Sequence, residues 1–253
     1  MNKFSLGVFA GGYKPFTLGH FSMLALAANE NDRAVLLYGL SARETPGSEF
    51  EYTSQMAKEI FEINKTAIER EMGNVEVLEA KPTPIAAVFL TIEAMKDNMT
   101  SGINPLVQLG INPASISKLT IYDGPDDITR YSKYAGDPVK REKYFGDMLE
   151  TGRIRFDSGP GESRGYAGML AVVKKWAKKD MSDVDLQQIR GTAIRKMVAS
   201  GAGLEEFKNV IPPIYNDEEA SRIFEIMKTG VKNKIQSNVS ETLRATIRAL
   251  IMG

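Results

Sequence analysis

Short apolar runs alternate along the chain with longer segments in which apolar residues recur every three to four positions. The short runs predict buried β-strands, and the longer segments predict amphipathic α-helices. The expected strands are residues 4–10, 34–41, 75–78, 118–123 and 153–157. The expected helices are residues 18–31, 53–72, 83–95, 128–134, 138–149, 166–178 and 189–200. Strands that alternate with helices over roughly 200 residues predict an α/β fold, a Rossmann-like doubly wound parallel sheet of about five strands.

Two local sequences add detail to this pattern. Thr83-Pro84 is typical of a helix start, because threonine accepts a hydrogen bond as an N-cap and proline suits the first helical position. The sequence Gly-Pro-Gly-Glu-Ser-Arg-Gly at 159–165 is interpreted as a glycine-rich loop. It lacks the Lys-Ser/Thr of a phosphate-binding P-loop, so we assign it no ligand.

The pattern changes after Pro212-Pro213. Over residues 216–235 acidic residues come first and lysines last, the order that the helix dipole favours, and residues 238–250 form a second amphipathic segment. We therefore expect an α/β domain over residues 1–212 and a helical C-terminal extension over residues 213–253. The apolar face of the second segment either packs on the α/β domain or joins two copies in a homo-oligomer.

Charge and composition exclude several classes of function. Lys+Arg and Asp+Glu number 32 each, so no overall field attracts the chain to nucleic acid or to an anionic membrane. The absence of cysteine excludes disulfides, thiolate catalysis and cysteine zinc sites, and the single histidine excludes a multi-histidine metal site. No stretch resembles a signal peptide or a membrane span. We expect a cytoplasmic protein with small-molecule partners, no nucleic acid, no membrane and no metal held by protein ligands.

The first expected strand ends in the sequence Gly-Gly-Tyr-Lys-Pro-Phe-Thr-Leu-Gly-His, residues 11–20. Ligands of open parallel sheets bind at the carboxyl ends of strands, where glycine lets the backbone approach a polyanion closely. The helix that follows is expected to offer unpaired N–H groups and a partial positive charge. Thr17 and His20 are three residues apart, so a helical turn directs both toward the same ligand, and Lys14 adds a cation. Together these residues predict a triphosphate-binding site.

This segment resembles the motif of the HxGH/TxGH nucleotidylyltransferases, Gly-x-Phe-x-Pro-x-(His/Thr)-x-Gly-His after a strand. The superfamily includes nicotinamide mononucleotide and phosphopantetheine adenylyltransferases and glycerol-3-phosphate cytidylyltransferase. A second segment, Ile-Arg-Gly-Thr-Ala-Ile-Arg at 189–195, is similar to the family's Ile-Ser-(Ser/Gly)-Thr-x-x-Arg turn at a helix start. Residues 205–212 resemble the segment after that turn in phage-encoded relatives, and the matches together span most of residues 4–212.

The resemblance implies a transfer without a covalent intermediate, carried by four residues. His20 and Thr17 would donate hydrogen bonds at the α-phosphate, while Lys14, Arg195 and the Mg²⁺ that accompanies the triphosphate would hold the β- and γ-phosphates. Thr192 would also cap its helix. The residues expected to bind the nucleotide are Gly11, Gly12, Tyr13, Gly19, Asp126, Gly191 and Thr192.

The expected function is transfer of AMP from ATP to a small phosphorylated acceptor, with release of pyrophosphate. CTP stays open as the donor, because the motif contacts phosphates rather than bases. Lys14, Arg190 and Asp127 depart from the family pattern. These departures leave open a catalytically degenerate relative that binds nucleotides or has a structural or assembly role. Asp126 and Asp127 also follow a strand, where aspartate is a common turn residue.

Overall fold

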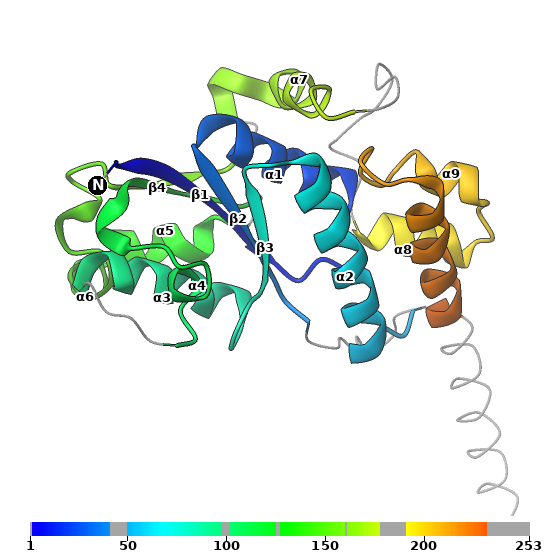
Figure 1. Cartoon of the computed structure of the whole chain (residues 1–253), viewed down its shortest axis with the longest axis horizontal. Coiled ribbons are helices and arrows are strands. Elements are labelled where there is room, and N and C mark those ends of the chain that lie inside the picture. Colours follow the sequence, from blue (N-terminus) through cyan, green and yellow to red (C-terminus); the bar gives the residue numbers. More distant parts are fainter. Residues whose placement is uncertain are drawn as a thin grey trace, which may run out of the picture.

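The computed structural model describes residues 2–40, 50–97, 102–124, 127–159, 161–177 and 191–231, with the backbone alone for 161–166. Its centre is a five-stranded parallel sheet in the order β3-β2-β1-β4-β5 (Figure 1). The strands are β1 (Phe4–Gly11), β2 (Arg33–Tyr38), β3 (Val75–Glu79), β4 (Ile116–Tyr122) and β5 (Ile154–Asp157). The chain builds outward from β1 to β3 and then crosses back to place β4 on the other side of β1. This reversal is the switch point of a doubly wound sheet, so the predicted fold class is confirmed.

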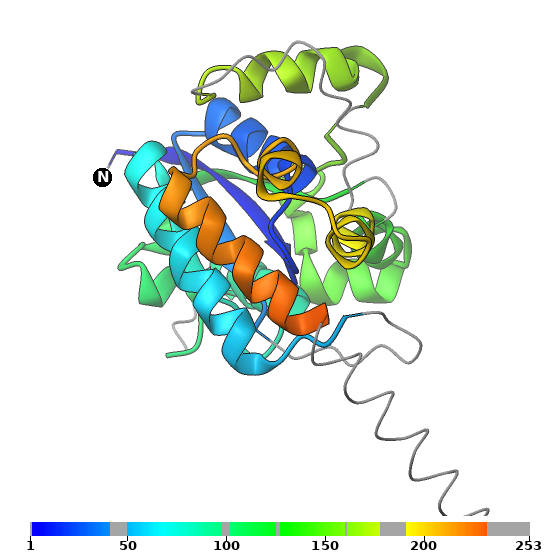
Figure 2. The same cartoon turned by 90° about the vertical axis from the view of Figure 1, so that its right-hand side faces the viewer.

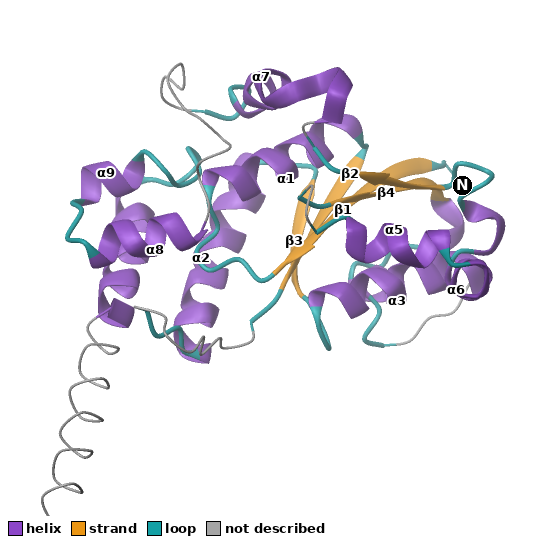
Figure 3. Cartoon of the chain, turned by 180° about the vertical axis from the view of Figure 1, so that it is seen from behind, coloured by secondary structure: helices purple, strands orange, loops and turns teal. Residues whose placement is uncertain are grey.

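Helices cover both faces of the sheet, with α1, α2 and α7 on one face and α3, α5 and α6 on the other (Figures 1 and 3). Their bounds are α1 (Leu18–Glu30), α2 (Ser54–Glu71), α3 (Pro84–Asp97), α4 (Pro105–Gln108), α5 (Thr129–Gly136), α6 (Pro138–Tyr144), α7 (Gly161–Val173), α8 (Gly191–Ala199) and α9 (Leu204–Lys208). Short 3₁₀ turns occupy Pro113–Ser115 and Gly146–Met148. None of the described helices has the length and hydropathy that crossing a lipid bilayer requires.

The strands are apolar on both faces because side chains alternate along them. In β1, Leu6 and Val8 belong to the same buried cluster as Val88 of α3, whereas Phe9 belongs to the cluster that contains Phe21 of α1. A strand buried on both faces appears in the sequence as a continuous apolar run. This explains why the runs are recognisable as strands without an alternating pattern.

One element begins earlier than expected. α7 runs from Gly161 to Val173, so most of the segment 159–165, interpreted as a loop, is helical, and the helix expected over 166–178 is shifted. A proline ahead of the helix and a glutamate in its first turn favour a helix start. These signals outweigh the cost of the glycines, about 1 kcal/mol each relative to alanine. The short helices α4 and α9 are not predicted from the sequence, because one turn leaves no measurable period.

The described part of the C-terminal extension packs on α2. Residues 217–231 form a helix that runs alongside α2 (Figure 2). A third buried cluster joins Ile60 of α2, Ile194 of α8 and Met227 of this C-terminal helix. Residues 232–253, with the second expected helix, lie outside the described residues. The division into two parts and the homo-oligomer therefore stay predictions.

Candidate functional site

The candidate site lies at the carboxyl ends of β1 and β4, the switch point of the sheet. β1 ends at Gly11, and residues 12–17 lead from it to the N-terminus of α1. β4 pairs with β1 in parallel, so Asp123, which comes directly after β4, lies at the same edge. Open α/β sheets bind their ligands at this edge.

Thr17 and His20 hold each other in a reciprocal capping arrangement at the start of α1. The His20 main-chain N–H donates to Thr17 Oγ1 at 3.2 Å, and the Thr17 main-chain N–H donates to His20 Nδ1 at 3.0 Å. Because a main-chain N–H can only donate, Nδ1 must accept, and the neutral ring carries its proton on Nε2. The local fold therefore leaves His20 with one proton to donate, at Nε2.

Aromatic rings surround the imidazole of His20. The Tyr13 ring packs edge-on with its centroid 5.0 Å from that of His20, and the Phe16 ring stacks at 5.9 Å. Loss of hydration lowers the pKa of His20 from its ordinary value of 6.5 to about 4. At neutral pH His20 is thus an uncharged hydrogen-bond donor.

We expect the His20 imidazole to titrate near pH 4 in the free protein and at higher pH beside a bound polyanion, which favours the protonated ring. Because the chain has a single histidine, NMR signals of imidazole during a pH titration report on this residue alone. The folded pKa lies below the unfolded one, so the free energy of unfolding should fall as the pH decreases from 6.5 to about 4. A folded-state pKa near 6.5 would contradict this environment.

The N-terminus of α1 is less open than the sequence indicates. The N–H groups of Thr17 and His20 are used within the capping arrangement, and the Leu18 N–H donates to the carbonyl of Val210 at 3.1 Å. The expectation of unpaired N–H groups is therefore wrong for these three residues. The tertiary contact with Val210 cannot be seen from the local sequence. An anion at this point would be bound mainly by side chains.

Lys14 is nearly buried, with 8% of its surface exposed. Its ammonium lies over the Tyr52 ring, 5.4 Å from the centroid, and its carbonyl accepts a hydrogen bond from Arg195 Nη1 at 2.6 Å. The sequence suggests a cation open to the ligand. The structure instead places Lys14 against an aromatic ring at the junction of the two motif segments.

The start of α8 contacts the first motif, although the two are 181 residues apart at Lys14 and Arg195. Arg195 donates to the Lys14 carbonyl through Nη1 and to Thr192 Oγ1 through Nη2 at 2.9 Å. A Cβ at Gly191 would lie 3.4 Å from both the Lys14 carbonyl oxygen and Arg195 Nη1, which is ordinary van der Waals contact, so this approach does not require glycine. Thr192 is the second residue of α8 and not its N-cap, so the expected capping role is wrong. Arg190 lies outside the described residues.

The glycines of the first motif have different surroundings. A Cβ at Gly11 would lie 2.7 Å from Cε1 of Tyr13, so the Tyr13 ring and not a ligand fills this space. Gly12 is exposed, with no atom within 4 Å of such a Cβ. Gly19 lies in the first turn of α1, where its carbonyl accepts from the Ser22 hydroxyl at 2.7 Å. The Tyr13 hydroxyl is buried and has no hydrogen-bond partner among the described residues.

Replacing Gly11 with alanine is expected to destabilise the fold by about 1–3 kcal/mol, because the new methyl group overlaps the buried Tyr13 ring. The same change at Gly12 meets open space and should be nearly neutral for stability. Thermal unfolding of the two variants side by side measures the difference. Equal melting temperatures would show that the Tyr13 ring is not packed against Gly11.

Asp123 is a candidate that the sequence pattern does not single out. It is 7% exposed, its Oδ1 accepts from the Gly124 N–H at 2.8 Å, and burial raises its pKa to about 7. Its signal in the sequence is its position at the end of a buried strand beside the glycine motif. Asp127 forms an ion pair with Arg130 on the surface. Asp126 lies outside the described residues.

The described residues contain no group of three or more His, Cys, Asp or Glu side chains that could hold a metal ion. Mg²⁺ commonly binds proteins through one or two carboxylates together with substrate phosphates. Asp123 is a buried carboxyl group at this edge, and a bound cation would favour its ionised form. Asp123 is therefore the described carboxyl group that would contact Mg²⁺ if the ion entered together with a nucleoside triphosphate.

No protein-family model matches the sequence, and no curated protein matches it either. Among solved structures, it is similar to Plasmodium falciparum nicotinic acid mononucleotide adenylyltransferase complexed with NaAD, at 13% identity and a TM-score of 0.44 over 87% of this chain and 95% of that chain. The same enzyme complexed with APC has 13% identity and a TM-score of 0.43, and the match covers 88% of this chain and 95% of that chain. Thermotoga maritima TmcAL bound with alpha-thio ATP has 17% identity and a TM-score of 0.39, and the match covers 92% of this chain and 56% of that chain. A function for this chain has to be inferred from its own residues.

Proposed function

We propose that the chain is a nucleotidylyltransferase, which transfers a nucleoside monophosphate to a small phosphorylated acceptor and releases pyrophosphate. The observation that carries the proposal is the contact between the two motif segments, in which the Arg195 guanidinium is bound to the Lys14 carbonyl. If the two segments resembled the family motifs only by chance, they would have no reason to meet at the switch point of the sheet. Two segments that bind the same ligand would have to meet there.

In the proposed reaction an oxygen of the acceptor phosphate attacks the α-phosphorus in line. A new P–O bond forms, the bond to the β-phosphate oxygen breaks, and pyrophosphate leaves. His20 donates from Nε2 to an α-phosphate oxygen, because its Nδ1 is occupied by Thr17. Arg195 is held by two hydrogen bonds where the two motif segments meet, and its guanidinium charge attracts the β- and γ-phosphates. Asp123 would help to hold a Mg²⁺ that accompanies the triphosphate, and the ion would neutralise part of the charge that develops.

ATP is the favoured donor, and CTP is the alternative. The segment Leu-Ser-Ala-Arg at 40–43, after β2, resembles the Gly-Ser-Ala segment of mononucleotide adenylyltransferases. Residues 41–43 lie outside the described residues, so the preference for adenine rests on this sequence resemblance.

A second candidate is a degenerate relative that binds nucleotides without transferring them. Two observations favour it: Lys14 is nearly buried, and three N–H groups at the start of α1 are already bonded. Such a protein would keep the nucleotide site for a structural or assembly role, and the C-terminal extension would supply the contact between copies.

Nucleotide binding is tested by thermal shift with ATP, CTP, GTP and UTP, each with Mg²⁺. At a hundredfold excess over Kd one site adds roughly 2.7 kcal/mol of stability, enough for a shift of several degrees. We expect a shift with ATP that is lost in the variant Arg195→Ala. If none of the four nucleotides raises the melting temperature, both candidate functions are wrong.

A further inference from the structure

A buried chain of hydrogen bonds leads from the first motif to the C-terminal segment. The Tyr38 hydroxyl donates to the carbonyl of Tyr13 at 2.6 Å and accepts from Asn64 Nδ2 at 3.0 Å. The Tyr215 hydroxyl then donates to Asn64 Oδ1. Tyr38 and Asn64 are 0% exposed, so the bond between these two side chains is shielded from water.

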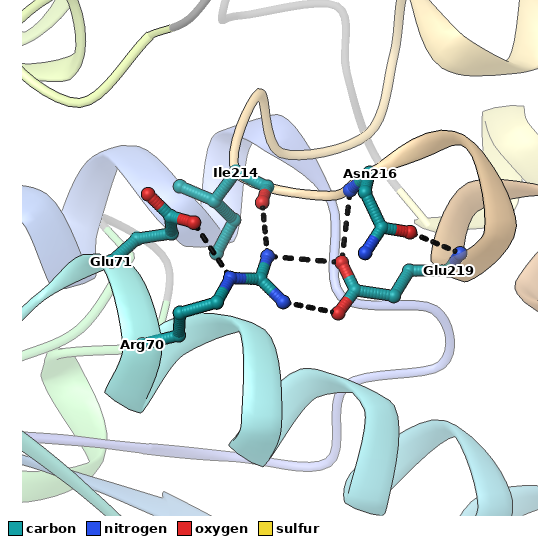
Figure 4. Close-up of polar contacts among 5 residues, drawn as sticks. All are labelled: Arg70, Glu71, Ile214, Asn216 and Glu219. Atoms are coloured by element: carbon teal, nitrogen blue, oxygen red, sulfur yellow. Dashed lines mark hydrogen bonds and ion pairs between the residues drawn. The ribbon is translucent and has the colours of Figure 1, made fainter.

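Arg70 of α2 holds the residues on either side of Tyr215, the last residue of this series of hydrogen bonds (Figure 4). Arg70 Nη2 donates to the Ile214 carbonyl at 2.9 Å, and the guanidinium pairs with both carboxylate oxygens of Glu219. Glu219 and Asn216 bond each other reciprocally, with the Asn216 N–H donating to Glu219 at 2.9 Å and the Glu219 N–H donating to Asn216 at 2.8 Å. Tyr215 is therefore held between two anchored neighbours.

We propose that Tyr38, Asn64 and Tyr215 are positioning residues, through which the C-terminal segment holds the motif loop in the geometry that the reaction needs. The inference rests on the proposed function, because it assumes that residues 12–17 and His20 contact the substrate. It assigns a role to residues 213–219, which no motif covers.

The geometry favours positioning over simple core packing. The Tyr38 hydroxyl donates to the main-chain carbonyl of Tyr13 in the loop. Arg195 donates to the next main-chain carbonyl, that of Lys14, at 2.6 Å. Two successive peptide groups are thus fixed by side chains from different elements. The Tyr13 ring in turn packs against His20 with centroids 5.0 Å apart, so a shift of Tyr13 would move the imidazole.

A residue shortly before this segment bonds the start of α1, directly after the loop. The Val210 carbonyl accepts from the N–H of Leu18, the first residue of α1. Simple packing would not require an amide at Asn64, since a leucine would fill the space without needing two partners. A buried amide that is satisfied on both sides specifies one arrangement of its neighbours.

The test compares Tyr38→Phe with Tyr122→Phe, which removes the hydroxyl of another fully buried tyrosine. The Tyr122 hydroxyl is bonded to Asn31 at 3.0 Å and Glu30 at 2.8 Å, at the far end of α1. Tyr38→Phe should lower kcat for pyrophosphate release from ATP by about tenfold, with KM for ATP changed less, because small displacements of catalytic groups are costly. It should also move the NMR signals of the His20 imidazole, whereas Tyr122→Phe should leave both kcat and these signals unchanged.

Tyr215→Phe serves as a second variant, because Tyr215 is only half-buried and lies outside the sheet. It should reproduce the effect of Tyr38→Phe, and the double variant should be little worse than either single one. Equal turnover and equal imidazole signals in Tyr38→Phe and Tyr122→Phe would overturn the positioning role. If the wild-type protein releases no pyrophosphate, the proposed function fails, and the imidazole signals still decide whether the hydrogen-bond chain positions the loop.

Discussion

Replacing His20 with alanine is expected to lower turnover by a factor on the order of 10²–10³, the usual loss when one preorganised donor to a developing charge is removed. Thr17 fixes Nδ1 as an acceptor, so in the proposed reaction Nε2 carries the proton that would be donated to an α-phosphate oxygen. Surrounding rings keep the imidazole neutral, which avoids a tight ground-state ion pair with the triphosphate. Steady-state pyrophosphate release measures the loss.

The control for this substitution is Asn29→Ala, which lies in the last turn of the same helix and contacts Lys175 on the surface. It should keep the turnover of the wild-type protein. His20→Ala also removes the acceptor for the Thr17 N–H, so a stability loss of about 1 kcal/mol is expected, typical of a lost cap. Melting temperatures of both variants separate this effect from the loss of turnover. Unchanged turnover in His20→Ala would remove His20 from the mechanism.

Replacing Arg195 with lysine is expected to lower kcat/KM for the triphosphate by about 10- to 100-fold, although the charge is kept. Arg195 bonds the Lys14 carbonyl with one nitrogen and Thr192 with another. Lysine has a single ammonium and no rigid fork, so it cannot make both bonds and also face a phosphate. Initial rates over a range of ATP concentrations measure the change.

The matched control is Arg222→Lys, which makes the same change in an exposed ion pair with Glu59. Surface pairs of this kind contribute little, so both stability and turnover should stay within experimental error of the wild-type values. If Arg195→Lys behaves like Arg222→Lys, the contact between the two motif segments is structural and has no part in phosphate binding.

Local signals predict the elements of this fold well. The five strands appear as apolar runs because both faces of the sheet are covered, and Thr83 caps α3 as expected, accepting from the Ala86 N–H at 3.2 Å. Thr17 and His20 are paired by a spacing of three, which a helical turn brings together. In each of these cases the partner lies within a few residues in the sequence.

Predictions that depend on distant partners are less successful. The Leu18 N–H is expected to be unpaired, but Val210 bonds it from the other end of the chain. The position of the Lys14 ammonium over the Tyr52 ring could not be foreseen either, and the role of Lys14 toward a ligand stays a prediction. Tyr38 and Asn64 look like ordinary members of a strand and a helix, because no local pattern shows which distant atom a buried polar group will meet.

Transfer from a nucleoside triphosphate is measured most simply as pyrophosphate release from ATP and Mg²⁺ in the presence of phosphorylated acceptors. Suitable probes are nicotinamide mononucleotide, phosphopantetheine and glycerol 3-phosphate, each with the wild-type chain and with His20→Ala. We predict release that requires one of the acceptors and falls by about 10²–10³ in the variant. The contradicting result is a protein that binds ATP but releases no pyrophosphate with any of the three acceptors, and releases none when CTP replaces ATP. That result would favour the degenerate nucleotide-binding protein.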